Sequence, residues 1–470
     1  MYQIRTTDIE IPVGDPFRNC KLGRQQYAEV LKTLTIGNNN GCVISLNGAW
    51  GTGKTTFIQM FKQMMNNEGY PTLYFNAWET DYISDPIIGL IGELKKLEGK
   101  GTKSRVKDMA QKIGPILVKR AIPEFLKHVL KKHAGEECAE ILKEVAKGGA
   151  ELFEAEIENY ENQKKSTEGF KKALGEYVST LGEKAPLIFI VDELDRCNPH
   201  YAVMVLERIK HLFSIPQIVF VLAIDKEQLC NSIKGYYGSD RIDAAEYLRR
   251  FIDIEYTLPS PDYRSFIKVE LERLDFQALF KGSQKMNTWE ETITSILVSF
   301  AEKSHLSLRQ VQKMMNQVRL TYSTIDVNNE NYTNRIFSLF LLVYIRSFHS
   351  EVYDLIKKKG ATLQEVASQI ERCLPLSLFN KDAEFNRAPG SLVYAFTAIL
   401  LMYSSDENGY PKYYSLFEKS EEGLKIKFSV ERFHEADIAE ALKYYDNMPI
   451  YITLDSLISK VELYDNVQVN

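Results

Sequence analysis

Several features that would place this chain in a familiar class are scarce in its sequence. Its 470 residues include six cysteines and seven histidines, with no C-x-x-C pair and no metal-like clustering of the two residue types. This excludes the usual zinc spacings and favours reduced thiols in a cytoplasmic protein. The first residues also lack the apolar stretch of a secretory signal peptide.

Long apolar runs are missing too. The longest nearly apolar runs, at residues 337–345 and 392–403, fall short of the roughly 20 residues that a helix needs to cross a bilayer. We therefore expect both runs to form buried core helices. We expect no transmembrane segment, while peripheral membrane association stays open.

A strong net charge of either sign is absent as well. The 58 Lys and Arg against 63 Asp and Glu give a net charge of −5, which argues against a protein built wholly around a nucleic-acid surface. Residues 95–132 nonetheless hold 12 Lys or Arg against three Asp or Glu. Because few aromatic residues stand among these cations, a solvated helical face is favoured there. Binding of nucleic acid, an anionic membrane or an acidic partner is the alternative.

What the sequence does contain is an alternation of helical and strand patterns, followed by helices alone. Residues 21–36 and 55–67 have helical spacing, and strands are predicted within 42–48, 71–78, 185–196 and 217–228. The last two strands are continuous apolar runs that end in an acidic residue, as in parallel sheets covered by helices on both faces. The pattern predicts an α/β core at residues 1–93 and 184–260 with a helical insertion at 94–183, between the second and third strands.

From about residue 258 the pattern becomes mainly helical, and we divide it into a segment at 261–330 and a C-terminal domain at 331–470. One helix start in the first segment is marked by a capping box. Ser307 can cap, Gln310 stands three residues later, and Leu306 can pack against Val311.

The motif with the least ambiguous chemistry lies between the first strand and the helix that follows it. The sequence from Gly48 to Thr55 fits G-x-x-x-x-G-K-[ST] in the structural context that this motif requires. Backbone N–H groups of such a loop, together with the helix N-terminus, hold the phosphates of a nucleotide. Lys54 can reach the β- and γ-phosphates, and the Thr55 hydroxyl can bind Mg²⁺. The predicted nucleotide-binding residues of the loop are Gly48, Trp50, Gly51, Thr52, Gly53, Lys54, Thr55 and Thr56.

Acidic residues that follow the third and fourth strands complete the predicted site. Asp192 can hold Mg²⁺ with Thr55, and Glu193 can take the proton of an attacking water. Asp195 has either a catalytic role or a structural one, in which it pairs with Arg196 and fixes the turn. Asp225 can contact the γ-phosphate, although an N-cap is favoured.

Arginines in two later segments are candidates for a shared site. Arg249 and Arg250 could act on a nucleotide from a neighbouring subunit, while surface charge on a helix is the plainer interpretation. Arg309 has the same ambiguity.

Together, "AWGTGKTT", "FNAWE", "VDELDRC", "VFVLAIDKEQL" and "EYLRRFIDIEYTLP" resemble the KAP family of P-loop NTPases over residues 16–320. The resemblance implies a P-loop NTPase fold in which Lys54, Thr55 and Asp192 bind ATP and Mg²⁺. Glu193 or Asp195 would orient water, although the family usually has Asp where Glu193 stands. It also implies that segment 261–330 is a helical lid.

Three functions follow as expectations. The first is an ATPase that acts as a molecular switch or assembly motor, and the resemblance extends to ATPase components of bacterial anti-phage defence systems. Such a protein would form a homo-oligomer and bind protein partners encoded in the same gene cluster. The second is a nucleotide-gated scaffold that binds ATP with little turnover, and the third is a P-loop kinase, for which no acceptor motif is present.

Overall fold

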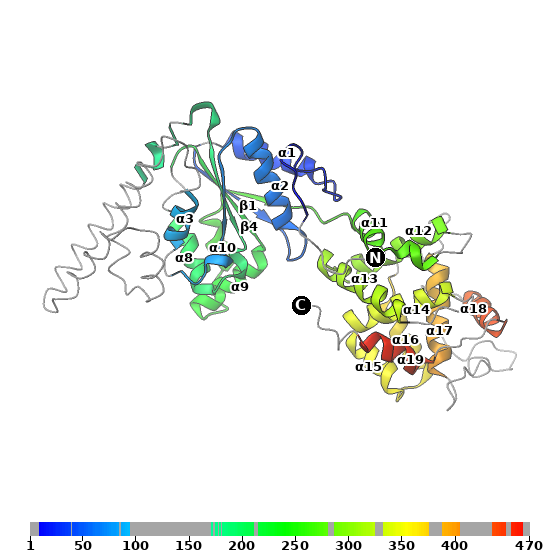
Figure 1. The fold of residues 1–470 in the computed structure, drawn as a ribbon. Coiled ribbons are helices and arrows are strands. Elements are labelled where there is room, and N and C mark those ends of the chain that lie inside the picture. Colours follow the sequence, from blue (N-terminus) through cyan, green and yellow to red (C-terminus); the bar gives the residue numbers. More distant parts are fainter. Residues whose placement is uncertain are drawn as a thin grey trace, which may run out of the picture. The chain divides into compact units, whose positions relative to one another are not determined.

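The computed structural model describes residues 9–38, 40–83, 86–94, 171–210 without 173, 177 and 180, 215–280, 286–324, 332–375, 388–404, 435–447 and 453–463. Contacts within the chain divide it into two compact units, with the boundary between Ser260 and Pro261. Figure 1 shows a sheet covered by helices in the first unit and helices alone in the second. We describe each unit by itself.

The first unit contains a five-stranded sheet whose strands are all parallel. The strands are β1 (Cys42–Asn47), β2 (Thr72–Asn76), β3 (Leu187–Asp192), β4 (Ile218–Ile224) and β5 (Ile254–Thr257). They lie in the order β2-β3-β4-β1-β5. Every residue of β3 and β4 is buried, which agrees with the continuous apolar runs that predicted these two strands.

Helices cover both faces of this sheet and create two cores. Alternate strand residues face α1 (Gln25–Gly37) and α2 (Lys54–Asn67) on one side. The others face α3 (Pro86–Leu94), α8 (Pro199–Ile209), α9 (Lys226–Tyr237) and α10 (Ala244–Arg249). The period of two along each strand therefore assigns successive apolar side chains to opposite cores. Short 3₁₀ turns are formed by Trp78–Thr80, Gly182–Lys184 and Leu194–Arg196.

The structure differs from the sequence-based pattern at two strands. β5 was not predicted, because its four residues alternate between half-buried and exposed positions on the edge of the sheet instead of forming an apolar run. β2 ends at Asn76, before the predicted end, because the Asn76 side chain accepts hydrogen bonds from the backbone N–H groups of Trp78 and Glu79. These bonds turn the chain into the 3₁₀ turn that follows.

Most of the predicted insertion, including its basic part at 95–132, lies outside the described residues. Near its end, the described residues between 171 and 179 are helical, and Leu174 and Val178 are buried in the same core as Leu90 and Leu94 of α3. The helical face predicted for this part of the insertion packs against the sheet domain at these two residues.

The second unit is helical and shares one apolar core. Its described elements are α11 (Tyr263–Arg273), η5 (Phe276–Phe280), α12 (Met286–Lys303), α13 (Leu308–Ser323), α14 (Tyr332–Phe348), α15 (Ser350–Lys358), α16 (Leu363–Cys373), α17 (Ala388–Tyr403), α18 (Glu435–Asn447) and α19 (Leu454–Glu462). The predicted division near residue 330 stays a prediction, since helices on both sides of it contribute to this core.

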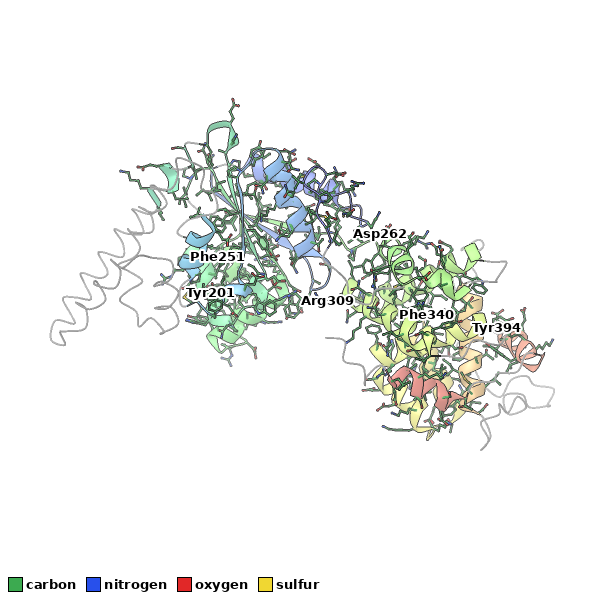
Figure 2. The ribbon with its side chains drawn as sticks, viewed as in Figure 1. Tyr201, Phe251, Asp262, Arg309, Phe340 and Tyr394 are labelled. Atoms are coloured by element: carbon green, nitrogen blue, oxygen red, sulfur yellow. The ribbon has the colours of Figure 1, made fainter. Side chains whose placement is uncertain are left out.

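The two longest apolar runs of the sequence form α14 and α17, and both are buried in this core, as predicted. Phe340 of α14 lies within it (Figure 2). Among the helices described, none combines the length and apolar content that crossing a bilayer would require.

The predicted capping box of α13 is also present. The Ser307 hydroxyl accepts a hydrogen bond from the Gln310 backbone, and the Gln310 side chain accepts one from the Ser307 backbone. Leu306 and Val311 on either side of the cap are both buried.

We expect Ser307→Ala to lower the free energy of unfolding of the helical unit by about 1 kcal/mol, because it leaves a helix N–H without its acceptor. Urea denaturation followed by circular dichroism measures this change. Arg309→Ala, at an exposed position of the same helix, is the matched control and should change stability by less than about 0.5 kcal/mol. Equal losses in the two variants would show that the cap is unimportant.

Candidate functional site

Parallel pairing brings the ends of three strands to one edge of the sheet. Asn47, the last residue of β1, pairs with Ile224, the last of β4, and Asp192 of β3 pairs with Ala223. The loop after β1, the turn after β3 and the residue after β4 therefore begin at nearly the same height. Ligands of open α/β sheets bind outside the carboxyl ends of strands such as these.

The glycine-rich loop wraps around the side chain of Lys54. Gly51 and Gly53 have φ of 77° and 84°, values that favour glycine. At Gly48, a Cβ atom would lie 3.3 Å from both Lys54 Cδ and Thr52 Oγ1. The Lys54 ammonium donates to the carbonyls of Gly48 at 2.5 Å and Ala49 at 3.4 Å. The loop is thus shaped around a buried cation.

Three carboxylates lie near enough to that cation to affect its pKa. Burial lowers the pKa of Lys54, and the negative charges of Asp195, Asp225 and Asp192 oppose this shift. Lys54 itself is buried. The predicted loop lysine and three of the predicted acidic residues therefore interact in one place.

Thr55 and Asp192 come together as a hydroxyl–carboxylate pair. The Thr55 side chain lies near enough to Asp192 to oppose the rise of its pKa. Asp192 also accepts hydrogen bonds from the Tyr74 hydroxyl at 2.9 Å and the Glu193 backbone at 2.8 Å. Asp192 is only 1% exposed, and burial raises its pKa to about 6, against the opposing effect of these hydrogen bonds. A hydroxyl and a carboxylate are both hard oxygen donors, so this pair fits Mg²⁺.

The turn after β3, residues 193–196, carries the other acidic side chains. Glu193 has φ of 58°, a left-handed conformation that is unusual for a residue with a side chain. The Arg196 guanidinium pairs with the Glu193 carboxylate at 3.1 Å and lies 5.6 Å from the centre of the Trp78 ring. The suggested pairing of Asp195 with Arg196 is therefore replaced by a pairing of Glu193 with Arg196.

Asp195 instead accepts a hydrogen bond from the indole N–H of Trp50. The backbone N–H of Trp50 donates to Asp225 Oδ2 at 3.1 Å. Asp225 Oδ1 accepts from the Gln228 backbone at 3.3 Å, so the favoured N-cap role of Asp225 is present. One carboxylate thus caps α9 and holds the loop.

Arg24 holds the loop at Thr52 and Gly53. Sequence reasoning missed it as a site residue. Its guanidinium donates to the carbonyls of Thr52 at 2.7 Å and Gly53 at 3.1 Å, and the residue is only 3% exposed. Burial lowers its pKa. Arg24 stands directly before α1, and no local pattern in the sequence indicates that it points at the loop.

The remaining predicted residues lie apart from this cluster or on its rim. Thr56 stands in the first turn of α2. Arg249 and Arg250 are exposed at the end of α10, and Arg249 pairs with Glu246. Soon after them, Asp253 bonds to Val43 near the amino end of β1, whereas the loop follows its carboxyl end. In the described part of the chain, neither arginine bonds to the loop. Arg309 is exposed on α13 of the helical unit (Figure 2).

The glycine-rich loop lies between the buried strand β1 and a helix, and the buried Asp192 ends β3, which is separated from β1 by one parallel strand. This arrangement defines a P-loop NTPase fold. The chain belongs to the KAP family, because the model of the KAP family P-loop domain matches residues 22–325. The expected resemblance is thus confirmed.

The chain is also similar to a phage T7 exclusion protein of Escherichia coli K12, with 21% identity over 256 residues, which are 51% of this chain and 32% of that protein. The chain therefore spans about a third of this relative. Among solved structures, the ORC2 protein of Aeropyrum pernix in ADPNP–ADP complexes has 13% identity and a TM-score of 0.34, with 94% and 93% of the two chains covered. AMPPCP-bound DnaA from Aquifex aeolicus has 11% identity and a TM-score of 0.28, with 95% of each chain covered.

We expect Arg24→Ala to lower the free energy of unfolding of the sheet unit by about 2 kcal/mol, because two charged hydrogen bonds to loop carbonyls are lost. Arg24→Lys should fall between this variant and the wild type, since an ammonium lacks the planar fork that reaches both carbonyls. Urea denaturation measures both, and Lys21→Ala at an exposed neighbouring position is the control. An unchanged free energy of unfolding in Arg24→Ala would contradict this role of Arg24.

The raised pKa of Asp192 predicts a pH-dependent affinity for Mg²⁺-nucleotide. Below about pH 6 the carboxyl group is protonated and binds a cation poorly, so affinity should rise between pH 5 and pH 7. Asp192→Asn should bind weakly and lose this part of the rise. The nucleotide's own phosphate titrates near pH 6 in both proteins, so the difference between them is the measurement, made with a fluorescent nucleotide. Parallel profiles would contradict the assignment.

Proposed function

We propose that this protein binds ATP with Mg²⁺ and hydrolyses it, and that turnover switches its assembly or its contacts with partner proteins. The observation that carries this proposal is the meeting of Lys54 and Thr55 of the loop with the buried Asp192. Membership of the KAP family supports nucleotide binding independently of that geometry. Hydrolysis itself is the step that needs an experiment.

In this proposal the loop residues 48–55 and the amino end of α2 bind the phosphates through backbone N–H groups. Lys54 places its charge on the β- and γ-phosphates once it exchanges loop carbonyls for phosphate oxygens. Thr55 and Asp192 would hold Mg²⁺, which would supply positive charge to neutralise the charge that develops on the phosphates.

The carboxylate that orients the attacking water comes from the turn after β3. Glu193 stands directly after Asp192, the proposed Mg²⁺ ligand, and can accept the proton of the water. Asp195 is the alternative, since it lies next to Lys54. Asp225 would act mainly by holding Trp50 of the loop, although a contact with the γ-phosphate is compatible with that bond.

The proposed biological setting is a bacterial anti-phage defence system in the cytoplasm. Its support is the similarity to a phage T7 exclusion protein, at 21% identity. A homo-oligomer, in which Arg249 or Arg250 of one subunit reaches the nucleotide of the next, fits their exposure at the end of α10. Proteins from the same gene cluster would be its partners. Binding of nucleic acid through residues 95–132 is a further possibility that this proposal includes.

A nucleotide-gated scaffold with little turnover is the second candidate. The observation that favours it is the ion pair between Glu193 and Arg196, because the Glu193 carboxylate is then engaged with the guanidinium and not with a water. ATP would then control oligomeric state through binding alone.

Phosphate release by the purified protein separates the two candidates. We expect steady release from the wild type and a roughly 100-fold or larger loss in Glu193→Gln, with ATP affinity retained, because the amide cannot accept a proton. Glu227→Gln, at an exposed position of α9, is a matched control and should behave like the wild type. A wild type that binds ATP without releasing phosphate would favour the scaffold.

A further inference from the structure

Trp50 is held by two carboxylates, each of which follows a different strand. Its backbone N–H donates to Asp225 after β4, and its indole N–H donates to Asp195 in the turn after β3. The residue is nevertheless 44% exposed. A side chain whose N–H end is fixed while much of its ring faces solvent is placed for its hydrogen bond more than for packing.

Asp195 depends on that one bond. It is 5% exposed, its Oδ2 atom accepts from Trp50, and its Oδ1 atom is buried without a hydrogen-bond partner among the described residues. Buried carboxylates normally accept several hydrogen bonds. Removing the indole N–H would therefore leave the Asp195 side chain without any hydrogen bond in the described part of the chain.

The turn that carries Asp195 is short and contains a strained residue. Glu193 stands in the left-handed region, and single backbone bonds, such as Arg196 N–H to the Glu193 carbonyl at 3.1 Å, close the turn. A strained conformation persists only where neighbouring contacts determine it. The contacts that do so include the Glu193 N–H bond to Asp192 and the Glu193–Arg196 ion pair, both close to the strained residue. The Trp50–Asp195 bond ties the turn to the loop.

We propose that Trp50 is a positioning residue, whose indole N–H holds Asp195 and thereby fixes Glu193 relative to the phosphate-binding loop. The proposal rests on the hydrolysis proposed above and deepens it. The loop that wraps the phosphates and the turn that carries the water-orienting carboxylate are joined through this contact. Placement of the nucleotide then determines placement of Glu193.

Two other roles predict different results. If the Trp50 ring only packs, phenylalanine should replace it without loss. If Asp195 itself exchanges protons with water, asparagine should fail as completely as alanine. A positioning role instead requires an acceptor oxygen at residue 195, which asparagine retains.

The test compares steady-state hydrolysis by Trp50→Phe, Asp195→Ala, Asp195→Asn and the Trp50→Phe/Asp195→Ala double variant. We expect kcat to fall roughly 10- to 100-fold in Trp50→Phe and in Asp195→Ala, with KM for ATP within about threefold, because misplacement affects the reacting geometry more than binding. The double variant should be no slower than either single variant. Asp195→Asn should lose clearly less than Asp195→Ala. Trp289→Phe in the helical unit is the control.

A second readout does not depend on turnover. With Trp78→Phe and Trp289→Phe, Trp50 is the only tryptophan of the chain. Adding ATP and Mg²⁺ should change its emission, and Asp195→Ala should abolish that change while thermal unfolding shows that the protein remains folded.

The outcomes separate this inference from the proposed function. Wild-type turnover together with an unchanged kcat in Trp50→Phe, or additive losses in the double variant, would overturn the inference and leave hydrolysis standing. A wild type that binds ATP without turnover would overturn hydrolysis. In that case the emission change decides the inference, which fails if the response is the same with and without Asp195.

Discussion

Parallel hydrogen bonding between β1, β4 and β3 is the constraint on which the whole site depends. It aligns Asn47 with Ile224 and Ala223 with Asp192, so three segments that are far apart in the sequence leave the sheet at one edge. A shift of one residue would turn alternate side chains into the wrong core, and the two apolar cores oppose such a shift. Burial of apolar side chains in the two cores thus fixes the strand register, and with it the geometry of the polar site.

That site has an unusual concentration of charge for its burial. Asp192, Asp195, Asp225 and Lys54 are all buried, and Arg24 is buried against the loop from the other side. Each charge is stabilised by a neighbour: Asp225 by loop and helix N–H groups, Asp192 by Tyr74, and Arg24 by two carbonyls. Asp195 has the fewest partners, which is why its bond to Trp50 matters. Arg24 holds the loop at Thr52 and Gly53, and Asp195 and Asp225 hold it at Trp50.

Local sequence rules predicted much of this protein because the features concerned are local. The glycine-rich loop and the capping box at Ser307 each depend on residues within one or two turns. The apolar runs that became β3, β4, α14 and α17 depend on burial alone. β5 was not predicted, because its residues alternate between half-buried and exposed positions and form no continuous apolar run.

The sequence by itself determined which chemical groups the protein contains and the fold class: a phosphate-binding loop, acidic residues at strand ends, and a helical second half. Only the tertiary structure decided which of these groups meet. Arg196 could pair with either neighbouring carboxylate, and packing turned it toward Glu193 and Trp78. Trp50 and Arg24 reach partners 145 and 28 or 29 residues away. The physical reason is that such contacts exist only after strands from distant parts of the chain have paired, and no local pattern encodes the pairing.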